Sequence, residues 1–338
     1  MICIKEKPYY NKYYMTHKST RNTNIEILRL ILMLAIFVWH ILVHGYNLKD
    51  IDGTSIIANN TQLIMLALLS PATYCFMFIS GYFGISYSNK RFGHLIFMCT
   101  SSLLITSIIA YTIKGSNPNI LSILFPLTKG PWWFIYWYII IMVVSPIINT
   151  GITIISKEQF RIILIIMLYF LIASTVQLKV NNGSNFIGLL TIYLLGRYIK
   201  IHKIKPSIPC ATGAYIISAL CMIISILCTN SIKPDKVFVL LSYCNPLIIT
   251  MAVSIFFITL NIQSTYNSIL NKILSPLLAI YLLTEGLSKW LYDDIASIMS
   301  NSILVGCVII LAISIGCIII GHILNTIYEY IYKKITQL

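Results

Sequence analysis

Residues 25–45 read IEILRLILMLAIFVWHILVHG, and this stretch decides the fold. Its length and apolar character match a transmembrane α-helix, which needs about 20 residues to cross a bilayer. Four ionisable side chains interrupt it: Glu26, Arg29, His40 and His44. Because a helix turns about 100° and rises about 1.5 Å per residue, Arg29 and His40 lie on one face about 16 Å apart, and the other two lie close to that face. Ionisable groups at this depth usually face a protein interior or a water-filled cavity, so the stripe predicts a functional site.

The whole chain has the composition of a polytopic membrane protein. Of its 338 residues, 58% are hydrophobic and only 10% are charged, with a mean hydropathy of +0.84; soluble domains carry about 25% charged residues. Nine apolar stretches are long enough to span a membrane, and a shorter tenth, 186–199, ends at Arg197. We therefore predict an all-α, polytopic helical membrane protein with about ten transmembrane helices. The nine longer stretches lie near residues 25–45, 63–84, 95–113, 132–150, 162–178, 208–228, 237–260, 273–292 and 302–327.

The basic residues predict the orientation of these helices. An even number of spans places both termini on one side, and all five arginines and most lysines then fall on that side. Positive charge accumulates in cytoplasmic loops, so the N- and C-termini are predicted to be cytoplasmic. The expected organisation is a cytoplasmic tail at 1–22, a transmembrane domain at 23–328 and a short cytoplasmic tail at 329–338, in the cell inner (cytoplasmic) membrane. Residues 1–22 lack the apolar core of a cleaved signal peptide, so the first span is expected to stay as an anchor.

The net charge of +14 follows mainly from this topology. A basic cytoplasmic rim faces anionic membrane lipids, and no nucleic-acid-binding motif accompanies it, so we expect lipid and not nucleic acid as a partner. The nine cysteines form no CxxC motif and no Cys/His cluster. We therefore expect buried, inert thiols and no metal site.

Prolines and tryptophans mark several expected boundaries. The prolines near the ends of spans are Pro71, Pro131, Pro146, Pro206, Pro246 and Pro276. Two of them, Pro246 and Pro276, have a second interpretation as breaks in helices beside a cavity, where neighbouring groups satisfy the freed backbone. The tryptophans expected to form an interfacial belt or to pack between helices, with sugar stacking as an alternative, are Trp132, Trp133, Trp137 and Trp290.

Further segments accompany the Arg29–His40 spacing in order along the chain. They are CFMFISGYF at 75–83, Lys90-Arg91, PWWF at 131–134 through Ser145-Pro146, YLLGRY at 193–198, YCNP at 243–246 with Ala252 and Phe256-Phe257, and YLLTEG at 281–286. Together, over roughly residues 21–325, this set resembles the acyltransferase family 3 of integral membrane acyltransferases.

The chain departs from this family at two places. Relatives that modify bacterial surface polysaccharides often carry His-Glu-Asn where this chain has Thr284, Glu285 and Gly286, so any role of that histidine is absent or moved here. The basic cluster at Lys90-Arg91 is also sparser than the multi-arginine versions.

The resemblance implies transfer of an acyl group, most often acetyl from acetyl-CoA, to a hydroxyl of a sugar, a lipid-linked glycan or a cell-wall polymer. Such an enzyme must activate a hydroxyl, stabilise an oxyanion and bind a polyanionic donor. His40 is the candidate for the first task, either as a base or as the carrier of the acyl group, because imidazole exchanges protons near neutral pH. No bound cofactor is expected; acetyl-CoA is a substrate.

Basic residues on the cytoplasmic side are the candidates for binding the donor's phosphates. The Arg29 guanidinium is planar and always charged, which suits it to bind phosphate, and it can pair with Glu26 at i, i+3. The donor's pantetheine arm would run from Arg29 to His40. The other predicted residues of this rim are Lys90, Arg91, His94 and Arg197, with Lys200 and His202 nearby.

Glu285 is the second informative acid. It lies in the middle of a predicted span, with Tyr281 one turn before it and Lys289 one turn after it. Either it orients a histidine or binds acceptor hydroxyls, or it forms a structural pair with Lys289. We place it with His40 and Arg29 as a candidate catalytic residue.

Two other classes of function remain open from the sequence. In a transporter or glycan flippase, Arg29, His40 and Glu285 would line a permeation path or a proton relay. In a scaffold that keeps the family's fold but has lost its activity, site residues would have changed, and the neighbours of Glu285 differ here from those of the relatives. A transporter moves substrate without consuming acyl-CoA, so release of coenzyme A distinguishes it from the enzyme. His44 also has a plain alternative, a position at the outer membrane interface.

Overall fold

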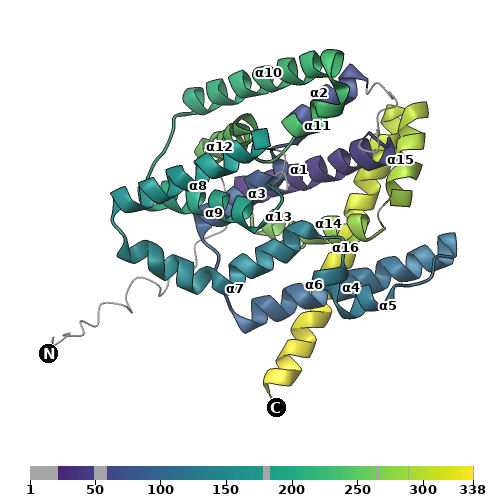
Figure 1. Ribbon diagram of the computed structural model, residues 1–338. Coiled ribbons are helices and arrows are strands. Elements are labelled where there is room, and N and C mark those ends of the chain that lie inside the picture. Colours follow the sequence, from purple (N-terminus) through teal and green to yellow (C-terminus); the bar gives the residue numbers. More distant parts are fainter. Residues whose placement is uncertain (1–21, 49–58, 178–182, 264–265, 288, 338) are drawn as a thin grey trace.

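The computed structural model describes residues 22–48, 59–177, 183–263, 266–287 and 289–337 (Figure 1). Within these ranges the regular secondary structure is helical, without a strand, which confirms the all-α prediction. Most of the predicted tail 1–22 lies outside the described residues. Asn22 is the N-cap of the first helix, and its side chain accepts a hydrogen bond from the Asn24 backbone N–H at 3.0 Å.

In the part of the chain that the structure describes, seven helical segments are long and apolar enough to cross a membrane. Four are single helices: α4 (Asn89–Lys114), α7 (Trp133–Ile154), α10 (Ile208–Ile232) and α16 (Ile303–Thr336). Three are helix pairs: α1 (Thr23–His40) with η1 (Ile41–Gly45), α2 (Asn60–Leu69) with α3 (Ala72–Phe83), and α13 (Ser268–Ile273) with α14 (Leu278–Leu287).

Three further helices coincide with predicted spans: α8 (Lys157–Gln177), α9 (Phe186–Ile201) and α12 (Pro246–Asn261). The last two have 16 residues each, fewer than the roughly 20 that cross a bilayer. The count of about ten crossings and the cytoplasmic position of both termini therefore stay predictions. Short helices complete the chain: α5 (Ile120–Leu124), α6 (Pro126–Lys129), η2 (Pro234–Lys236), α11 (Val237–Leu240) and α15 (Lys289–Asn301).

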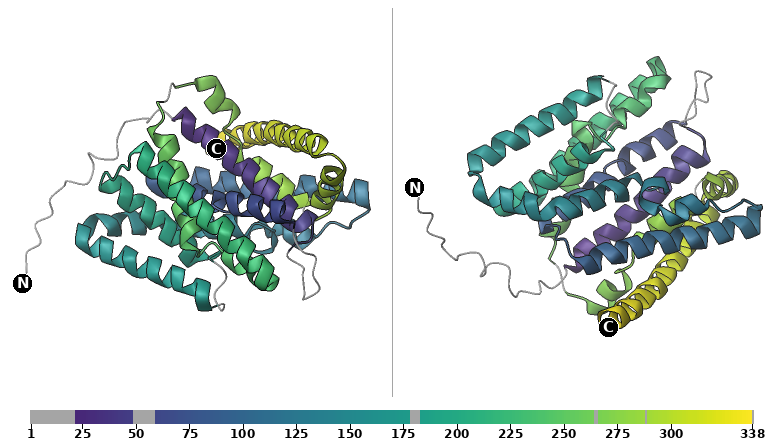
Figure 2. Two further views of the ribbon diagram at one scale, coloured as in Figure 1. Left: turned by 90° about the horizontal axis from the view of Figure 1, so that it is seen from above. Right: turned by 60° about the horizontal axis from the view of Figure 1, so that its bottom comes forward.

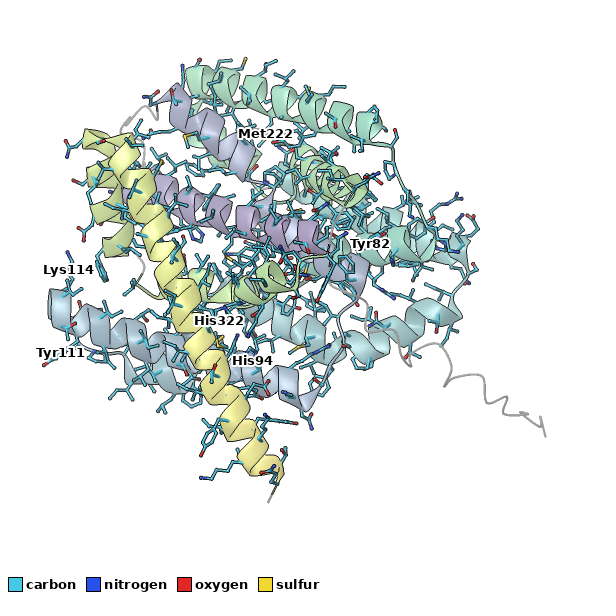
Figure 3. The ribbon with its side chains drawn as sticks, turned by 180° about the vertical axis from the view of Figure 1, so that it is seen from behind. Tyr82, His94, Tyr111, Lys114, Met222 and His322 are labelled. Atoms are coloured by element: carbon cyan, nitrogen blue, oxygen red, sulfur yellow. The ribbon has the colours of Figure 1, made fainter. Side chains whose placement is uncertain are left out.

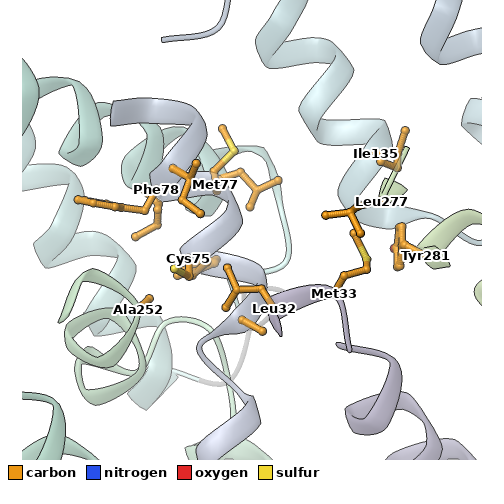
Figure 4. Packing of buried hydrophobic residues seen from close by; sticks show 14 of the residues in the cluster. Leu32, Met33, Cys75, Met77, Phe78, Ile135, Ala252, Leu277 and Tyr281 are labelled. Atoms are coloured by element: carbon orange, nitrogen blue, oxygen red, sulfur yellow. The ribbon is translucent and has the colours of Figure 1, made fainter. Parts of the chain in front are cut away.

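Helix α1 crosses the middle of the bundle, with α10 on one side and α4 on the other (Figures 1 and 2). It contacts α3, α12 and α14, so the stripe of ionisable residues on α1 is surrounded by protein. The centre is filled by side chains from these helices, with Leu32 beside Cys75 and Ala252, and Met33 beside Leu277 and Tyr281 (Figure 4).

Helices α3 and α9 touch through their backbones at glycines. A Cβ atom at Gly81 would lie 2.3 Å from the carbonyl oxygen of Tyr193, and one at Gly196 would lie 2.7 Å from that of Phe78. Without hydrophobic attraction between helices in lipid, such close backbone approach is a main source of association. The Ser80-Gly81 pair is therefore part of a helix-packing contact.

Two predicted spans are interrupted, which corrects their expected boundaries. The stretch 237–260 begins with α11 and breaks before α12, whose first residue is Pro246, capped by the Asn245 side chain. The stretch 273–292 comprises the end of α13, a turn that contains Pro276, helix α14 and the start of the separate helix α15. The interpretation of Pro276 as a break beside a cavity agrees with this geometry, because its neighbours Ser275 and Leu277 line a cavity.

Two other helices extend beyond a position that was predicted to be a boundary. Pro146 does not end its helix: α7 continues to Ile154, since a proline inside a helix removes one backbone hydrogen bond without necessarily stopping it. Helix α16 runs through the predicted boundary at residue 328 to Thr336. Tyr328, 7% exposed, packs on α4 there and donates a hydrogen bond to the Lys90 carbonyl at 2.7 Å, which holds this part of α16 against α4.

Candidate active site

The stripe on α1 forms one wall of a cavity of about 220 Å³. Its lining includes Glu26, Arg29, Met33, Ile36 and His40, which follow each other at the three- and four-residue spacing of a helix face. The prediction that Arg29 and His40 share a face is therefore confirmed.

Glu26 and Arg29 form an ion pair at one end of this cavity. Arg29 Nη1 donates to Glu26 Oε1 at 2.7 Å, and the Glu26 side chain is 5% exposed while that of Arg29 is 31% exposed. A buried carboxylate requires such a partner. The predicted i, i+3 pair is present. Arg29 is the more exposed partner, and its side chain also lines the cavity.

At the other end, His40 is held by a carboxylate from a distant helix. His40 Nδ1 lies 2.7 Å from Oε2 of Glu285 on α14. Oε2 also accepts a hydrogen bond from the Tyr292 hydroxyl of α15 at 2.7 Å, and that hydroxyl lies 3.4 Å from His40 Nδ1. A carboxylate at Nδ1 fixes the imidazole orientation and stabilises its protonated form. Nε2, on the opposite edge of the ring, points away from Glu285 and is available for chemistry.

Of the roles considered for Glu285, this geometry agrees with orientation of a histidine. The Lys289 side chain lies outside the described residues. The departures beside Glu285 have local explanations: Thr284 Oγ1 donates to the Ile280 carbonyl at 2.7 Å, and a Cβ atom at Gly286 would lie 2.9 Å from Thr106 Oγ1 on α4. Glycine at 286 therefore permits close packing of α14 on α4.

The chain changes from an α-helix to a π-helix directly after His40. The i→i+5 hydrogen bonds of a π-turn shift the phase of the residues that follow and are frequent at functional sites. His44 consequently does not continue the stripe along the cavity, as its spacing predicted; its ring stacks on Tyr292 with centroids 6.1 Å apart. Gly45 permits this contact, because a Cβ atom there would lie 2.3 Å from the Tyr292 carbonyl oxygen.

Aromatic and hydroxyl side chains form the wall opposite α1. Thr73 and Tyr243 line the cavity together with His40, and their hydroxyl oxygens lie 3.3 Å apart. The Tyr243 ring packs against Trp133, with centroids 5.4 Å apart. Trp133 and Tyr281 also line the cavity, so Trp133 is a wall of the candidate site as well as a packing residue.

A second cavity of about 670 Å³ adjoins the first. The two share several lining residues, Arg29 and Ser275 among them. The second cavity is also lined by Lys90, Arg91 and His94 of α4, so four of the five predicted phosphate-binding residues meet in one wall. Figure 3 shows His94 where α16 crosses α4, and its Nε2 lies 2.7 Å from Asn325 Oδ1 of α16.

Arg197 lines neither of these cavities and is not brought to this wall. A Cβ atom at Gly84 would lie 2.9 Å from Arg197 Nη1, so the guanidinium lies against that turn. Lys200 Nζ lies over the Tyr82 ring at 4.7 Å. Burial, and secondarily the nearby Lys157, lower the pKa of His202. These positions on and after α9 therefore lie apart from the basic wall of α4.

Two polar residues of this second cavity were not predicted from the sequence: Asn325 and Glu329 of α16. Tyr292 was also missed, although in the predicted helix 273–292 it lies two turns after Glu285 and on the same face. Across the described ranges no group of three or more His, Cys, Asp or Glu side chains is placed to hold a metal ion.

Comparison with known proteins gives one finding. A family model described as an acyltransferase domain matches residues 22–327, which is nearly the whole chain. The match includes the α1 stripe, the basic residues of α4, and the Glu285–Tyr292 region. Neither the curated proteins nor the solved structures contain a match to the chain.

Proposed function

We propose an O-acetyltransferase function for this protein, because the chain belongs to the acyltransferase family whose domain model spans residues 22–327. The donor in this proposal is acetyl-CoA, and the acceptor is a hydroxyl of a surface polysaccharide or of a lipid-linked glycan. The observation that carries it is the arrangement of adjoining cavities, with His40 held by Glu285 at one end and four basic residues at the other.

The basic wall provides the site for the donor's phosphates. Arg29 and Arg91 offer planar guanidinium groups that bind phosphate through two N–H groups at once, while Lys90 acts as a point charge. The pantetheine arm would then run along the α1 stripe, which separates Arg29 from His40 by about 16 Å. This direction brings the thioester to His40 and leaves the nucleotide at the wider cavity.

His40 would activate the acceptor through Nε2. In the direct route, Nε2 takes the proton of the acceptor hydroxyl, the hydroxyl oxygen bonds to the acetyl carbon, and the carbon–sulfur bond breaks. The departing thiolate takes the proton from His40, so coenzyme A leaves as a thiol. Glu285 stabilises the intermediate imidazolium, and general base catalysis of this kind contributes about 10²–10⁴-fold.

A two-step route uses the same atoms. Nε2 attacks the thioester carbon, coenzyme A leaves, and the acetyl group then passes from Nε2 to the acceptor oxygen, whose proton is released. Mass spectrometry of protein incubated with acetyl-CoA without acceptor distinguishes the routes, because only the second leaves an acetyl group on His40. In either route the hydroxyls of Thr73 and Tyr243 are the proposed donors to the developing oxyanion.

The proposed setting is the cell inner membrane, with about ten crossings and both termini cytoplasmic. The wider cavity would then open toward cytoplasmic acetyl-CoA, in agreement with the positive charge of α4 at this end.

The function is tested by measuring coenzyme A release from acetyl-CoA by purified protein in lipid, with a panel of lipid-linked glycans and polysaccharide fragments. Release that depends on one class of acceptor, accompanied by an acetyl ester on that acceptor, is the expected result. Flux of a glycan across the membrane without coenzyme A release would contradict the proposal and support a transporter.

A further inference from the structure

A carboxylate lies in the wall where the proposed function places a polyanionic donor. Glu329 of α16 lines the wider cavity together with Lys90 and Arg91 of α4. Its Oε2 lies 2.7 Å from Lys90 Nζ, and both side chains are about half exposed, 46% and 45%. A carboxylate repels phosphate, so this residue requires an explanation that the donor site alone does not provide.

The contact between α16 and α4 does not depend on this ion pair. Tyr328 donates a hydrogen bond to the Lys90 carbonyl at 2.7 Å, and its ring packs on that of His94 with centroids 4.9 Å apart. Gly93 permits this approach, since a Cβ atom there would lie 2.9 Å from the Tyr328 hydroxyl. Exposed ion pairs contribute little to stability, so holding the two helices together is not a sufficient reason for Glu329.

The environment of Lys90 differs from that of the other two cations of this wall. Arg29 is paired with Glu26, which is deeply buried. Arg91 donates from Nη1 to the Ser86 carbonyl at 3.2 Å and to the Ser86 hydroxyl, both neutral acceptors. Lys90 faces a half-exposed carboxylate that can turn away into solvent. Of these three cations, Lys90 can therefore exchange its anionic partner with the smallest structural change.

We propose, on the basis of the donor site in the proposed function, that Glu329 is an internal counter-ion of that site. In the empty site its carboxylate occupies Lys90, and a phosphate of acetyl-CoA displaces it. One ion pair breaks and another forms, without covalent change. Because the donor must compete with Glu329, the residue weakens binding of acetyl-CoA and equally that of the product, coenzyme A, which carries the same phosphates.

The opposite role for Glu329 would be to hold Lys90 in position for the phosphate. The two roles predict changes of opposite sign when the charge is removed. A counter-ion weakens donor binding, so its removal tightens binding; a positioning residue strengthens donor binding, so its removal weakens binding.

The experiment compares wild type with Glu329→Gln, which removes the charge and keeps the shape. The matched control is Glu158→Gln on α8, whose carboxylate is also exposed and paired, with Arg161 at 2.5 Å, but does not line either of these cavities. The readouts are the KM for acetyl-CoA, kcat, and the dissociation constant of free coenzyme A, each at low and at high salt.

For Glu329→Gln we expect the KM and the coenzyme A dissociation constant to fall by about two- to fivefold at low salt, the range of exposed ion pairs, and less at high salt. The control should match wild type. An unchanged or raised dissociation constant in Glu329→Gln, with wild-type transfer intact, would overturn the counter-ion role and leave the proposed function standing. Wild type that neither binds coenzyme A nor transfers acetyl would overturn both.

Discussion

Exchanging Glu285 for glutamine removes the negative charge that lies 2.7 Å from His40 Nδ1. At this separation and an effective dielectric constant of about 20, the attraction between carboxylate and imidazolium is about 6 kcal/mol. Part of it is offset by desolvation of the carboxylate, which is only 16% exposed. About 4–5.5 kcal/mol remains, which corresponds to a loss of about 10³–10⁴ in kcat, the size found when the carboxylate of a catalytic triad is neutralised.

The assay is acceptor-dependent release of coenzyme A at saturating acetyl-CoA, with membrane levels of the variants matched. The KM for acetyl-CoA should change by less than about twofold. Glu285 lies at the far end of the stripe from the phosphate wall, so its exchange leaves the binding of the donor's phosphates unchanged. Tyr292→Phe, which removes one hydrogen bond to the Glu285 carboxylate but leaves its charge in place, should lose less, about ten- to one-hundredfold. A Glu285→Gln variant that keeps kcat within about threefold of wild type would refute the reasoning.

Three further predictions concern Arg29, Gly45 and His202. Arg29→Gln should raise the KM for acetyl-CoA at least about tenfold, since it removes a phosphate ligand and leaves Glu26 buried without its partner; donor titrations of kcat/KM check this. Gly45→Ala should lower kcat and thermal stability together, because its Cβ would lie 2.3 Å from the Tyr292 carbonyl oxygen; a fully stable, active variant would contradict it. Burial lowers the pKa of His202 below its usual 6.5, so the folded state binds fewer protons there and stability falls as the pH drops below about 6.5. Between neutral and acidic pH, the melting temperature of His202→Gln should therefore fall less than that of wild type. Thermal shift in detergent measures this, and an equal fall in both proteins would contradict it.

The α1 side of the site was predictable from the sequence because a helix has a fixed period. An offset of eleven positions, with ten residues between them, places Arg29 and His40 on one face whatever the neighbouring helices do, and the structure has a cavity along that face. Glu285 was predicted from resemblance rather than geometry; the long-range contact that gives it a role, with His40, comes from the packing of α14 beside α1.

The parts that were missed depend on tertiary contacts that no local pattern contains. The phase of His44 changed because a π-turn follows His40, and the helical period assumed for it no longer applied. Glu329 falls in the predicted tail 329–338, yet Tyr328 and Asn325 pack the adjoining part of α16 on α4. Arg197 has the right charge for the donor wall, but α9 packs on α3 through glycines and holds it elsewhere.

The central claim is that His40 performs acyl transfer at the end of the α1 stripe. The most direct test compares wild type, His40→Gln and, as a matched control, His322→Gln on α16, in the rate of acetyl ester formation on an acceptor in lipid. The account predicts loss of transfer in His40→Gln alone, with coenzyme A binding retained by all three proteins. Transfer at the wild-type rate by His40→Gln would contradict it.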